Sequence, residues 1–359
     1  MNIASAKSKI KCVVWDLDNT LWDGILLEST GPMTPKPEAI TLIKELDSRG
    51  ILQSIASRNE HDIAIEALDA CGLKDYFLYP QIGWGAKSQA ITAIAEQLNI
   101  GLDTFAFIDD QPFEREEVQS VHGVVRVFDE TTLPMLSARD EFQPLYVTDD
   151  SKQRRALYQR DALRKQAQES FAGPEESFLR SLEMKLTLAS AREKDLFRAE
   201  ELTVRTNQLN TTGVTYSVDD LRGLIASPNH QVVVAELSDR YGSYGAIGLV
   251  LLSQNPDSSD TQSGWCIDLF LMSCRVMSRG VGGVILTLLR RSAAALGQNL
   301  RARFVETDRN RMMYVTYRFA GFTEEQGTDL LINSLENIPA IPDYMAVTIE
   351  SDLGWRYES

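Results

Sequence analysis

The sequence predicts two α/β domains of different kinds, joined near residue 150. In the first 150 residues, short apolar runs alternate with helical patterns, which is typical of a parallel, doubly wound sheet. After residue 177, apolar runs follow one another with short breaks before a strongly apolar helical pattern, which favours an antiparallel α+β domain. The length of 359 residues also fits two domains better than one.

The first domain is predicted to cover residues 1–150. Apolar runs predict strands at 11–15, 51–56, 77–81, 104–108 and 124–128. Helical spacing of apolar residues predicts helices at 37–48, 62–68 and 88–98. Acidic residues follow the first and the fourth of these strands. Because ligands bind at the carboxyl ends of strands in such sheets, we expect the acidic residues to mark the site.

Residues 151–176 are predicted to form a helical connector with a basic face. Its helical part, 151–168, contains one acidic and six basic residues. Such a face is usually only solvated, and the alternative is a docking surface for an acidic partner. Residues 177–359 are predicted to form the second domain. Strands are predicted at 184–188, 231–237, 245–252 and 265–272, and helices at 194–206 and 283–296. The segments 301–306, 311–320 and 346–350 complete the pattern.

Composition and charge exclude several classes of protein. A net charge of −15 argues against nucleic acid or an anionic membrane as a partner. No apolar run reaches the roughly 18 residues of a membrane span, and the first residues are too polar for a signal peptide. Three histidines exclude a histidine-rich metal site, and Cys12, Cys71, Cys266 and Cys274 lack zinc spacing. We therefore expect a cytoplasmic protein with reduced thiols.

Two acidic pairs follow predicted strands. Asp16 and Asp18 lie in the turn directly after strand 11–15, and Asp109 and Asp110 follow strand 104–108. Residues 16 and 18 alternate along an extended segment that then turns, so their carboxylates can converge on one ligand. Carboxylate oxygens are the ligands that Mg²⁺ prefers, and this ion also bridges phosphate groups. The four aspartates therefore predict a Mg²⁺ site.

A hydroxyl and an ammonium group complete this set. Ser57 follows the second strand, where its hydroxyl can hold a phosphate oxygen, and Lys87 precedes a helix, where it can neutralise phosphate charge. An aspartate can attack phosphorus once a metal ion and a lysine have screened the repulsion between the anions. A second aspartate can protonate the leaving oxygen and later activate water. The set therefore predicts phosphoryl transfer.

In this order the residues resemble the haloacid dehalogenase superfamily of phosphohydrolases, over about residues 10–128. The resemblance implies a Rossmann-like core. It assigns Asp16 as nucleophile and Asp18 as acid/base and metal contact. It implies further roles for Thr20, Ser57 and Lys87 in substrate binding and for Asp109 and Asp110 in holding Mg²⁺. Only 36 residues separate Thr20 from Ser57, so we expect a minimal cap and an open site that suits a bulky substrate.

The second group of residues surrounds Cys274. It follows strand 265–272 and is followed by a turn that contains Arg275, Arg279, Gly280 and Gly282 and leads into a helix. Glycines at a strand-to-helix turn expose backbone N–H groups that can bind an anion. With Asn310 and the residues after it, this segment resembles the GCN5-related N-acetyltransferase (GNAT) fold over about 177–350. The resemblance implies that the turn and Asn310 bind substrate. It also implies that the neighbouring strand edge holds a pantetheine arm, from coenzyme A or from a carrier protein.

The two halves together resemble FkbH-like proteins. The residues that carry this resemblance are the segments 13–22, 107–110 and 273–276, in that order. The resemblance implies a glyceryltransferase/phosphatase of polyketide biosynthesis. Such an enzyme takes 1,3-bisphosphoglycerate, removes phosphate and loads a glyceryl unit onto the phosphopantetheine of an acyl carrier protein. Cys274 would then be the catalytic thiol that holds the acyl group. Because carrier proteins are typically acidic, the connector and Arg290/Arg291 are the candidate docking surfaces.

Three other functions remain open from the sequence. One is a stand-alone Mg²⁺-dependent phosphatase of small phosphorylated metabolites, whose second domain is only a scaffold. Another is a non-catalytic protein that docks a carrier protein. The third is an acetyl-coenzyme A N-acetyltransferase, for which the sequence offers no evident base or amine site.

Overall fold

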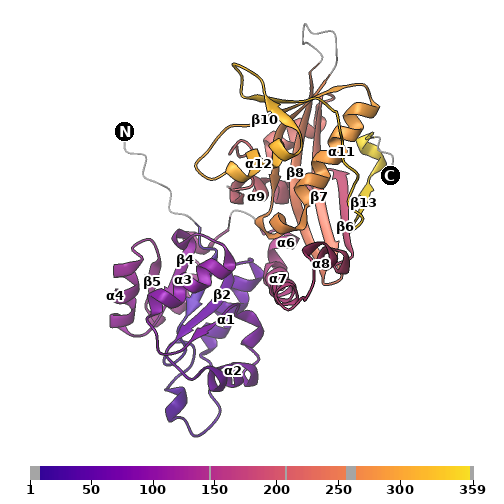
Figure 1. Cartoon of the computed structure of the whole chain (residues 1–359). Coiled ribbons are helices and arrows are strands. Elements are labelled where there is room, and N and C mark those ends of the chain that lie inside the picture. The colour runs from indigo at the N-terminus through magenta and orange to yellow at the C-terminus, as the bar shows by residue number, and fades with distance from the viewer. Residues whose placement is uncertain (1–8, 145–146, 207, 256–263, 356–359) are drawn as a thin grey trace, which may run out of the picture. The chain divides into compact units, whose positions relative to one another are not determined.

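The chain is divided into two compact units in this computed structural model, which describes residues 9–144, 147–206, 208–255 and 264–355 (Figure 1). Unit 1 is Met1–Gln159 and unit 2 is Arg160–Ser359. The division therefore falls inside helix α7 (Arg154–Glu169), within the range 151–176 for which the sequence predicts a connector. No helix of the described chain is both long and apolar enough to cross a membrane.

Unit 1 is built on a five-stranded sheet in the order β3-β2-β1-β4-β5. All neighbouring strands in this sheet are parallel. The strands are β1 (Cys12–Trp15), β2 (Leu52–Ser57), β3 (Gln81–Ile82), β4 (Phe105–Ile108) and β5 (Arg126–Phe128). The order reverses between β1 and β4, so their carboxyl ends define the crevice where such sheets bind ligands.

Helices cover both faces of this sheet, which is why β1 and β4 are buried along their whole length. The principal helices are α1 (Pro37–Ser48), α2 (His61–Ala70), α3 (Lys87–Leu98) and α4 (Pro112–Val121). The apolar residues of α1 and α2 pack in one core cluster, and those of α3 and α4 pack in another. Both α1 and α4 begin with a proline, whose missing N–H costs nothing at that position.

The segment between β1 and α1 is too short to form a cap domain. It contains the single 3₁₀ turn η1 (Leu26–Glu28) and otherwise runs as a loop that pairs Trp22 with Pro35. Other short elements of unit 1 are η2 (Lys74–Tyr76), η3 (Leu102–Thr104), η4 (Glu130–Thr132), α5 (Leu133–Leu136), η5 (Asp140–Phe142) and α6 (Asp149–Lys152). The minimal cap predicted from the spacing of Thr20 and Ser57 is confirmed.

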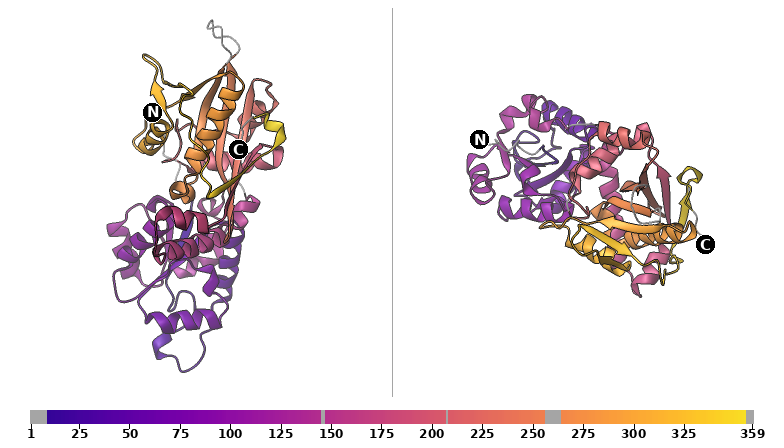
Figure 2. Two further views of the ribbon diagram at one scale, coloured as in Figure 1. Left: turned by 45° about the vertical axis from the view of Figure 1, so that its right-hand side comes forward. Right: turned by 90° about the horizontal axis from the view of Figure 1, so that it is seen from above.

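Unit 2 is built on an eight-stranded mixed sheet in the order β11-β12-β10-β9-β8-β7-β6-β13, seen from two further directions in Figure 2. The strands are β6 (Met184–Ser190), β7 (His230–Asp239), β8 (Gly242–Asn255), β9 (Gly264–Met272), β10 (Asn299–Arg303), β11 (Phe322–Glu324), β12 (Leu330–Asn333) and β13 (Met345–Ile349). The sheet departs from the antiparallel arrangement expected from the sequence. The pairs β9/β10 and β6/β13 are parallel.

Helices also flank both faces of this second sheet. The principal ones are α8 (Glu175–Ser181), α9 (Leu196–Arg205), α10 (Val218–Ala226), α11 (Val281–Ala295) and α12 (Arg311–Phe319). The apolar residues of α9 and α10 pack in one core cluster, whereas those of α8, α11 and α12 pack in another. Because α11 connects β9 to β10, these two strands run parallel. The short 3₁₀ helices of this unit are η6 (Glu193–Asp195), η7 (Cys274–Arg279) and η8 (Ser351–Leu353).

Some local expectations were wrong. The strand expected at 77–81 is only a single bridge at Phe77 followed by the two residues of β3, because Tyr79 has φ +50° and Pro80 has no N–H. The helix expected at 151–168 is two helices, α6 and α7. Helices α4 and α10 were not predicted, because their apolar signal is weak. Among their apolar residues only Val118 and Leu221, respectively, are buried.

Three of the six basic residues expected on the solvated face of the connector bind other segments of the chain instead. The Arg154 guanidinium is buried and donates to the carbonyl of Gly50 (2.6 Å). Arg155 forms a two-pronged contact with Asp47 (2.8 and 3.2 Å). These arginines therefore fix the first turn of α7 to the rest of unit 1. At the other end of the helix, the buried Arg164 pairs in the same way with Asp239 in unit 2 (2.8 Å to each oxygen).

Candidate functional site

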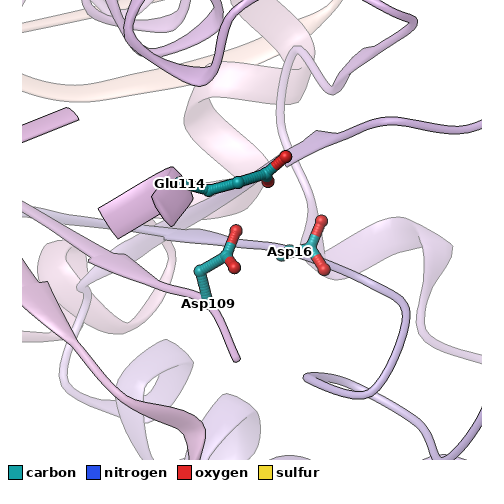
Figure 3. Close-up of side chains that lie close together, drawn as sticks. All are labelled: Asp16, Asp109 and Glu114. Atoms are coloured by element: carbon teal, nitrogen blue, oxygen red, sulfur yellow. The ribbon is translucent and has the colours of Figure 1, made fainter. Parts of the chain in front are cut away.

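Three carboxylates converge at the carboxyl edge of the sheet in unit 1. Asp16 follows β1 directly, Asp109 follows β4 directly, and Glu114 lies in the first turn of α4. One oxygen from each lies within 4.8 Å of the others, and Figure 3 shows the carboxylates facing one another. All-oxygen groups of this kind are suited to a hard divalent cation such as Mg²⁺.

Lys87 at the start of α3 joins these carboxylates. Its ammonium group contacts Asp16, Asp109 (3.1 Å) and Glu114 (2.9 Å) and also donates to the carbonyl of Ala56 (2.8 Å). The side chain is almost completely buried. A buried ammonium group is stable only when it is paired, so the three acids hold the lysine as much as the lysine holds them.

Burial and mutual charge shift the pKa values of these groups. Burial raises the pKa of Asp16, and Lys87 and Ser57 only partly oppose this by donating to its carboxylate. Burial likewise raises the pKa of Asp109, to about 7. Burial alone would lower the pKa of Lys87, but Asp16, Asp109 and Glu114 together raise it above its ordinary value. The cluster carries more acid than one lysine neutralises, which favours binding of a further cation.

Asp16 is the least buried carboxylate of this cluster. Its side chain is 9% exposed, compared with 5% for Glu114 and 0% for Asp109. Ser57, at the end of β2, donates to the same carboxylate. Asp16 is thus oriented by a hydroxyl and is the least buried of the three carboxylates, which suits the nucleophile.

Asp18 is held by donors outside this cluster. One oxygen accepts from Trp22 Nε1 (2.9 Å) and from the N–H of Leu26 (3.1 Å), and the other accepts from Asn59 Nδ2 (3.0 Å). These three donors fix the carboxylate against the loop after β1. Its predicted role as acid/base and metal contact stays a prediction.

Thr20 and Asp110 bind each other. The Thr20 hydroxyl donates to the Asp110 carboxylate (3.3 Å) and accepts from the Asp110 N–H (3.0 Å). Thr20 is completely buried, so in this conformation it joins the loops after β1 and β4 and does not face a ligand. Asp110, predicted as a metal ligand, lies outside the three-carboxylate cluster, whose third member is Glu114, and its role stays a prediction.

Glu114 was missed by the sequence analysis. An acidic residue in the first turn of a helix is ordinarily explained by the helix dipole, so nothing in the sequence singles it out. In the folded chain it is buried and contacts Lys87, while Arg58 contacts its other oxygen (3.1 Å). The useful signal would have been its position five residues after Asp109, in the first turn of the helix that begins at the same edge of the sheet.

A pH dependence of stability follows for the metal-free protein. An unfolded Asp109 ionises near 3.8, whereas the folded one keeps its proton up to about 7. The folded chain therefore binds more protons in this interval, and Asp109 makes the free energy of unfolding fall as the pH rises through it. We expect a stability loss on the order of 2 kcal/mol between pH 5 and 7.5 in EDTA, measured by urea unfolding.

The Asp109→Asn variant isolates this effect from other titrating groups. Its stability should change less than that of the parent over the same pH interval, and added Mg²⁺ should restore the parent at pH 7.5. Equal slopes for parent and variant in EDTA would contradict the assigned pKa.

In unit 2, Cys274 lies on the surface. It is exposed and begins the short helix η7 (Cys274–Arg279), directly after the end of β9. The neighbouring arginines are directed elsewhere. Arg275 donates to the carbonyl of Tyr244 (2.8 Å), and the buried Arg279 donates to Gln168 (3.1 Å).

The two glycines of the predicted anion-binding turn fit against the chain's own side chains. Gly280 has φ +72° and caps α11, and an added Cβ would lie 2.6 Å from the Tyr344 hydroxyl. A Cβ at Gly282 would lie 2.6 Å from the terminal methyl of Met272. Their predicted contact with substrate stays a prediction.

Asn310 is fully used by the backbone of unit 2. Its amide donates to the carbonyls of Asn210 (3.0 Å) and Val305 (2.9 Å), and its oxygen accepts from the N–H of Thr307 (2.9 Å). The residue is also completely buried. In this conformation it therefore orders two loops, and no free donor remains for the predicted substrate.

Unit 2 also contains a cavity of about 240 Å³ on the side of the sheet that faces α10. Polar groups of Tyr216, His230, Asp268 and Arg303 line it, among apolar side chains. Cys274 is not among its lining residues, so the predicted catalytic thiol and this cavity are separate features of the unit.

Of the two arginines expected to form a basic docking surface, Arg290 is buried and Arg291 is half-buried, so the surface stays a prediction for Arg291 alone. Arg290 is buried and donates to Asn333 (3.0 Å) and to the carbonyl of Glu336 (2.7 Å). Arg291 donates to the carbonyl of Pro339 (3.1 Å). Both guanidinium groups hold the segment after β12 against α11.

The four thiols should differ strongly in their rates of alkylation. Cys274 is exposed, whereas burial raises the pKa of Cys12 and Cys71, and burial together with Asp268 raises that of Cys266 to about 12. Because only thiolates react, iodoacetamide at pH 7.5 should label Cys274 first and Cys12 and Cys266 last. Peptide mass mapping of a time course measures this order, and early labelling of Cys266 would contradict it.

Comparisons with known proteins found similar solved structures for parts of the chain only. No protein-family model and no curated protein matches the chain. Among solved structures, a phosphatase-domain part of protein BF1531 from Bacteroides fragilis, complexed with Mg, is 29% identical. That match covers 34% of this chain and 36% of that chain, with a TM-score of 0.31. This chain therefore spans about a third of that structure.

Two other solved structures are similar to parts of this chain. A haloacid dehalogenase superfamily hydrolase from Ehrlichia chaffeensis is 15% identical, covering 34% of this chain and 88% of that one (TM-score 0.29). The aminoglycoside 6'-N-acetyltransferase AAC(6')-Ih from Acinetobacter baumannii is 13% identical, covering 40% and 94% (TM-score 0.32). The predicted fold class is confirmed at the level of architecture: a doubly wound parallel α/β unit with a minimal cap is followed by an α+β unit.

Proposed function

We propose that this chain is a bifunctional glyceryltransferase/phosphatase. Unit 1 removes a phosphate group at Asp16, and unit 2 holds an acyl group at Cys274 and passes it to the phosphopantetheine thiol of an acyl carrier protein. The observation that supports the first activity most strongly is the meeting of Asp16, Asp109, Glu114 and Lys87 at the switch point of the sheet.

The carboxylate oxygens of Asp16, Asp109 and Glu114 fit a Mg²⁺ ion by number and by chemistry. When bound, the ion supplies positive charge that screens the phosphate from the attacking carboxylate. Lys87 shares this task, since its ammonium group already contacts Asp16. Ser57 holds the carboxylate in place, as its hydroxyl donates to it.

Asp16 then attacks the phosphorus of a phosphate ester. The bond from phosphorus to the glyceryl oxygen breaks, and Asp18 is proposed to give that oxygen its proton. Water then attacks the phosphorus while Asp18 is proposed to take its proton back, the bond from phosphorus to the Asp16 oxygen breaks, and inorganic phosphate and the free carboxylate result. Because residues 20–36 form no cap domain, the site can accept a phosphorylated group that is attached to a larger molecule.

The proposed transfer uses the exposed Cys274 thiol. The thiolate attacks the acyl carbon of 1,3-bisphosphoglycerate, the carbon–oxygen bond to phosphate breaks, and inorganic phosphate leaves. The pantetheine thiolate of the carrier then attacks the resulting thioester, and the Cys274 thiolate is the leaving group. The exposure of Cys274 supports this proposal, since a carrier protein can reach it.

Intact-mass spectrometry tests both activities together. The full chain is mixed with Mg²⁺, a phosphopantetheinylated carrier protein and enzymatically generated 1,3-bisphosphoglycerate. The expected result is a carrier that gains the mass of one glyceryl unit, with phosphate released. Phosphate release without any carrier adduct would instead indicate a stand-alone phosphatase. Carrier binding with neither product would indicate a docking protein.

A further inference from the structure

The two parallel strands at the centre of unit 2 pair only over part of their length. Register between β9 and β10 runs from the pair Gly264/Asn299 to the pair Ile267/Ala302. Strand β9 then continues to Met272 and stays paired with β8 on its other side. The remaining edge of β9, toward β10, is therefore the place where an extended ligand could add a further strand.

The chain itself already occupies this edge. Residues 209–212 run antiparallel to β9, with a bridge between Asn210 and Leu271. The N–H of Met272 donates to the carbonyl of Leu209 (2.9 Å), and the N–H of Thr211 donates to the carbonyl of Phe270 (3.0 Å). We name residues 209–212 the inserted segment.

Further hydrogen bonds of Thr211 fill the gap between β9 and the segment after β10. The N–H of Phe270 donates to the Thr211 hydroxyl (3.0 Å). On the other side, the N–H of Val305, two residues after β10, donates to the Thr211 carbonyl (3.0 Å). The inserted segment thus bonds to both sides of the gap, and the N–H and C=O groups of β9 at Phe270 are satisfied within the unit.

The inserted segment is also part of the core. Each of Leu209, Asn210, Thr211 and Thr212 is at most 5% exposed. The Asn210 side chain fixes the turn at the end of the inserted segment. Its oxygen accepts from the N–H groups of Thr212 (3.0 Å) and Gly213 (2.9 Å). The inserted segment is therefore packed into the core and hydrogen-bonded to the edge of β9.

The residues therefore do not fit the pantetheine arm that the GNAT resemblance implies along this strand. The turn after β9 agrees with this. The Tyr344 hydroxyl occupies the space beside Gly280, and Arg279 points inward to Gln168. We propose that the inserted segment excludes a phosphopantetheine arm, whether from coenzyme A or from a carrier protein, from the gap between β9 and β10. The arm of the carrier instead meets Cys274 at the surface of the unit.

The first half of this proposal is independent of the proposed function, and the second half rests on it. Equilibrium dialysis of the full chain against coenzyme A and acetyl-coenzyme A tests the first half. We expect no saturable binding up to 1 mM. Saturable binding of either compound below that concentration would overturn the proposal.

Hydrogen exchange tests the route of the carrier. The amides of Thr211, Phe270, Met272 and Val305 should be protected in the free full chain. Adding phosphopantetheinylated carrier under loading conditions should change their exchange rates by less than twofold. Exchange at Phe270 and Met272 that becomes tenfold faster during loading would show that the arm displaces the inserted segment, which overturns the proposal.

A matched pair of variants tests whether hydrogen exchange detects a loss of bonding between the inserted segment and β9. Thr211→Val removes the hydroxyl that accepts from Phe270 and should speed exchange of that amide at least tenfold. Thr215→Val changes an exposed threonine of the same loop and should leave it unchanged. If the carrier is never loaded, the proposed function fails while the dialysis result stands. If loading occurs with faster exchange, only the present inference fails.

Discussion

The Asp16→Asn variant is expected to lose phosphate release by at least about a thousandfold, the size of effect seen when a nucleophile is removed. The amide has the same shape as the carboxylate but cannot attack phosphorus. Its partners Lys87 and Ser57 stay in place, so the geometry of the site should be kept. Release of inorganic phosphate from p-nitrophenyl phosphate and from 1,3-bisphosphoglycerate, with Mg²⁺ present, measures the loss.

The same variant should fold normally. Burial raises the pKa of Asp16, which means that its charge is unfavourable in the folded chain. The neutral amide removes that cost, so the melting temperature in EDTA should not fall below that of the parent. Asp62→Asn, at a carboxylate that is 95% exposed on α2, is the matched control and should keep full activity. Phosphate release by Asp16→Asn at more than a tenth of the parental rate would contradict the assigned nucleophile.

The Cys274→Ala variant is expected to abolish glyceryl loading of the carrier while phosphate release at Asp16 continues. Loss of the thiol removes the group proposed to form the thioester, so loading should fall at least about a thousandfold. Because Cys274 is exposed at the start of η7, the change removes no buried contact and should leave stability within about 0.5 kcal/mol. Intact-mass spectrometry of carrier and enzyme measures both species.

Cys71→Ala is the matched control for this experiment. Cys71 lies in unit 1, where its thiol donates to the carbonyl of Met33 (3.4 Å). The Cys71→Ala variant should therefore load the carrier at the parental rate. In the Asp16→Asn background with Cys274 intact, the carrier should carry a phosphoglyceryl rather than a glyceryl group. Loading that persists in Cys274→Ala would assign the acyl group to another residue and would exclude the proposed role of this thiol.

The site of unit 1 was largely predictable because its residues follow strands. A parallel sheet brings the carboxyl ends of β1 and β4 to one edge, so Asp16 and Asp109 meet whatever the intervening loops do. Glu114 and Asn59 were not predictable in this way. They come from a helix start and a loop, and only the final packing places one beside Lys87 and the other beside Asp18.

The site of unit 2 was less predictable because it was expected from a glycine-rich turn and from charged side chains, and both can serve the fold as well as a ligand. A glycine-rich turn in the sequence is compatible with an anion, but Gly280 equally serves a helix cap beside Tyr344. Arg279 and Arg290 look exposed in a sequence of mixed charge, yet both are buried against partners from distant segments. The pattern of charges along the chain does not tell which of them face solvent.

The sequence by itself determined the two kinds of fold, the minimal cap and the position of the acidic cluster, because periodicity and spacing along the chain control these directly. The tertiary structure alone decided that Glu114 joins Asp16 and Asp109, that Thr20 binds Asp110, and that residues 209–212 close the gap beside β9. Each of these depends on contacts between residues far apart in the chain. Local pattern leaves such contacts open, and only the packing of the complete core selects among them.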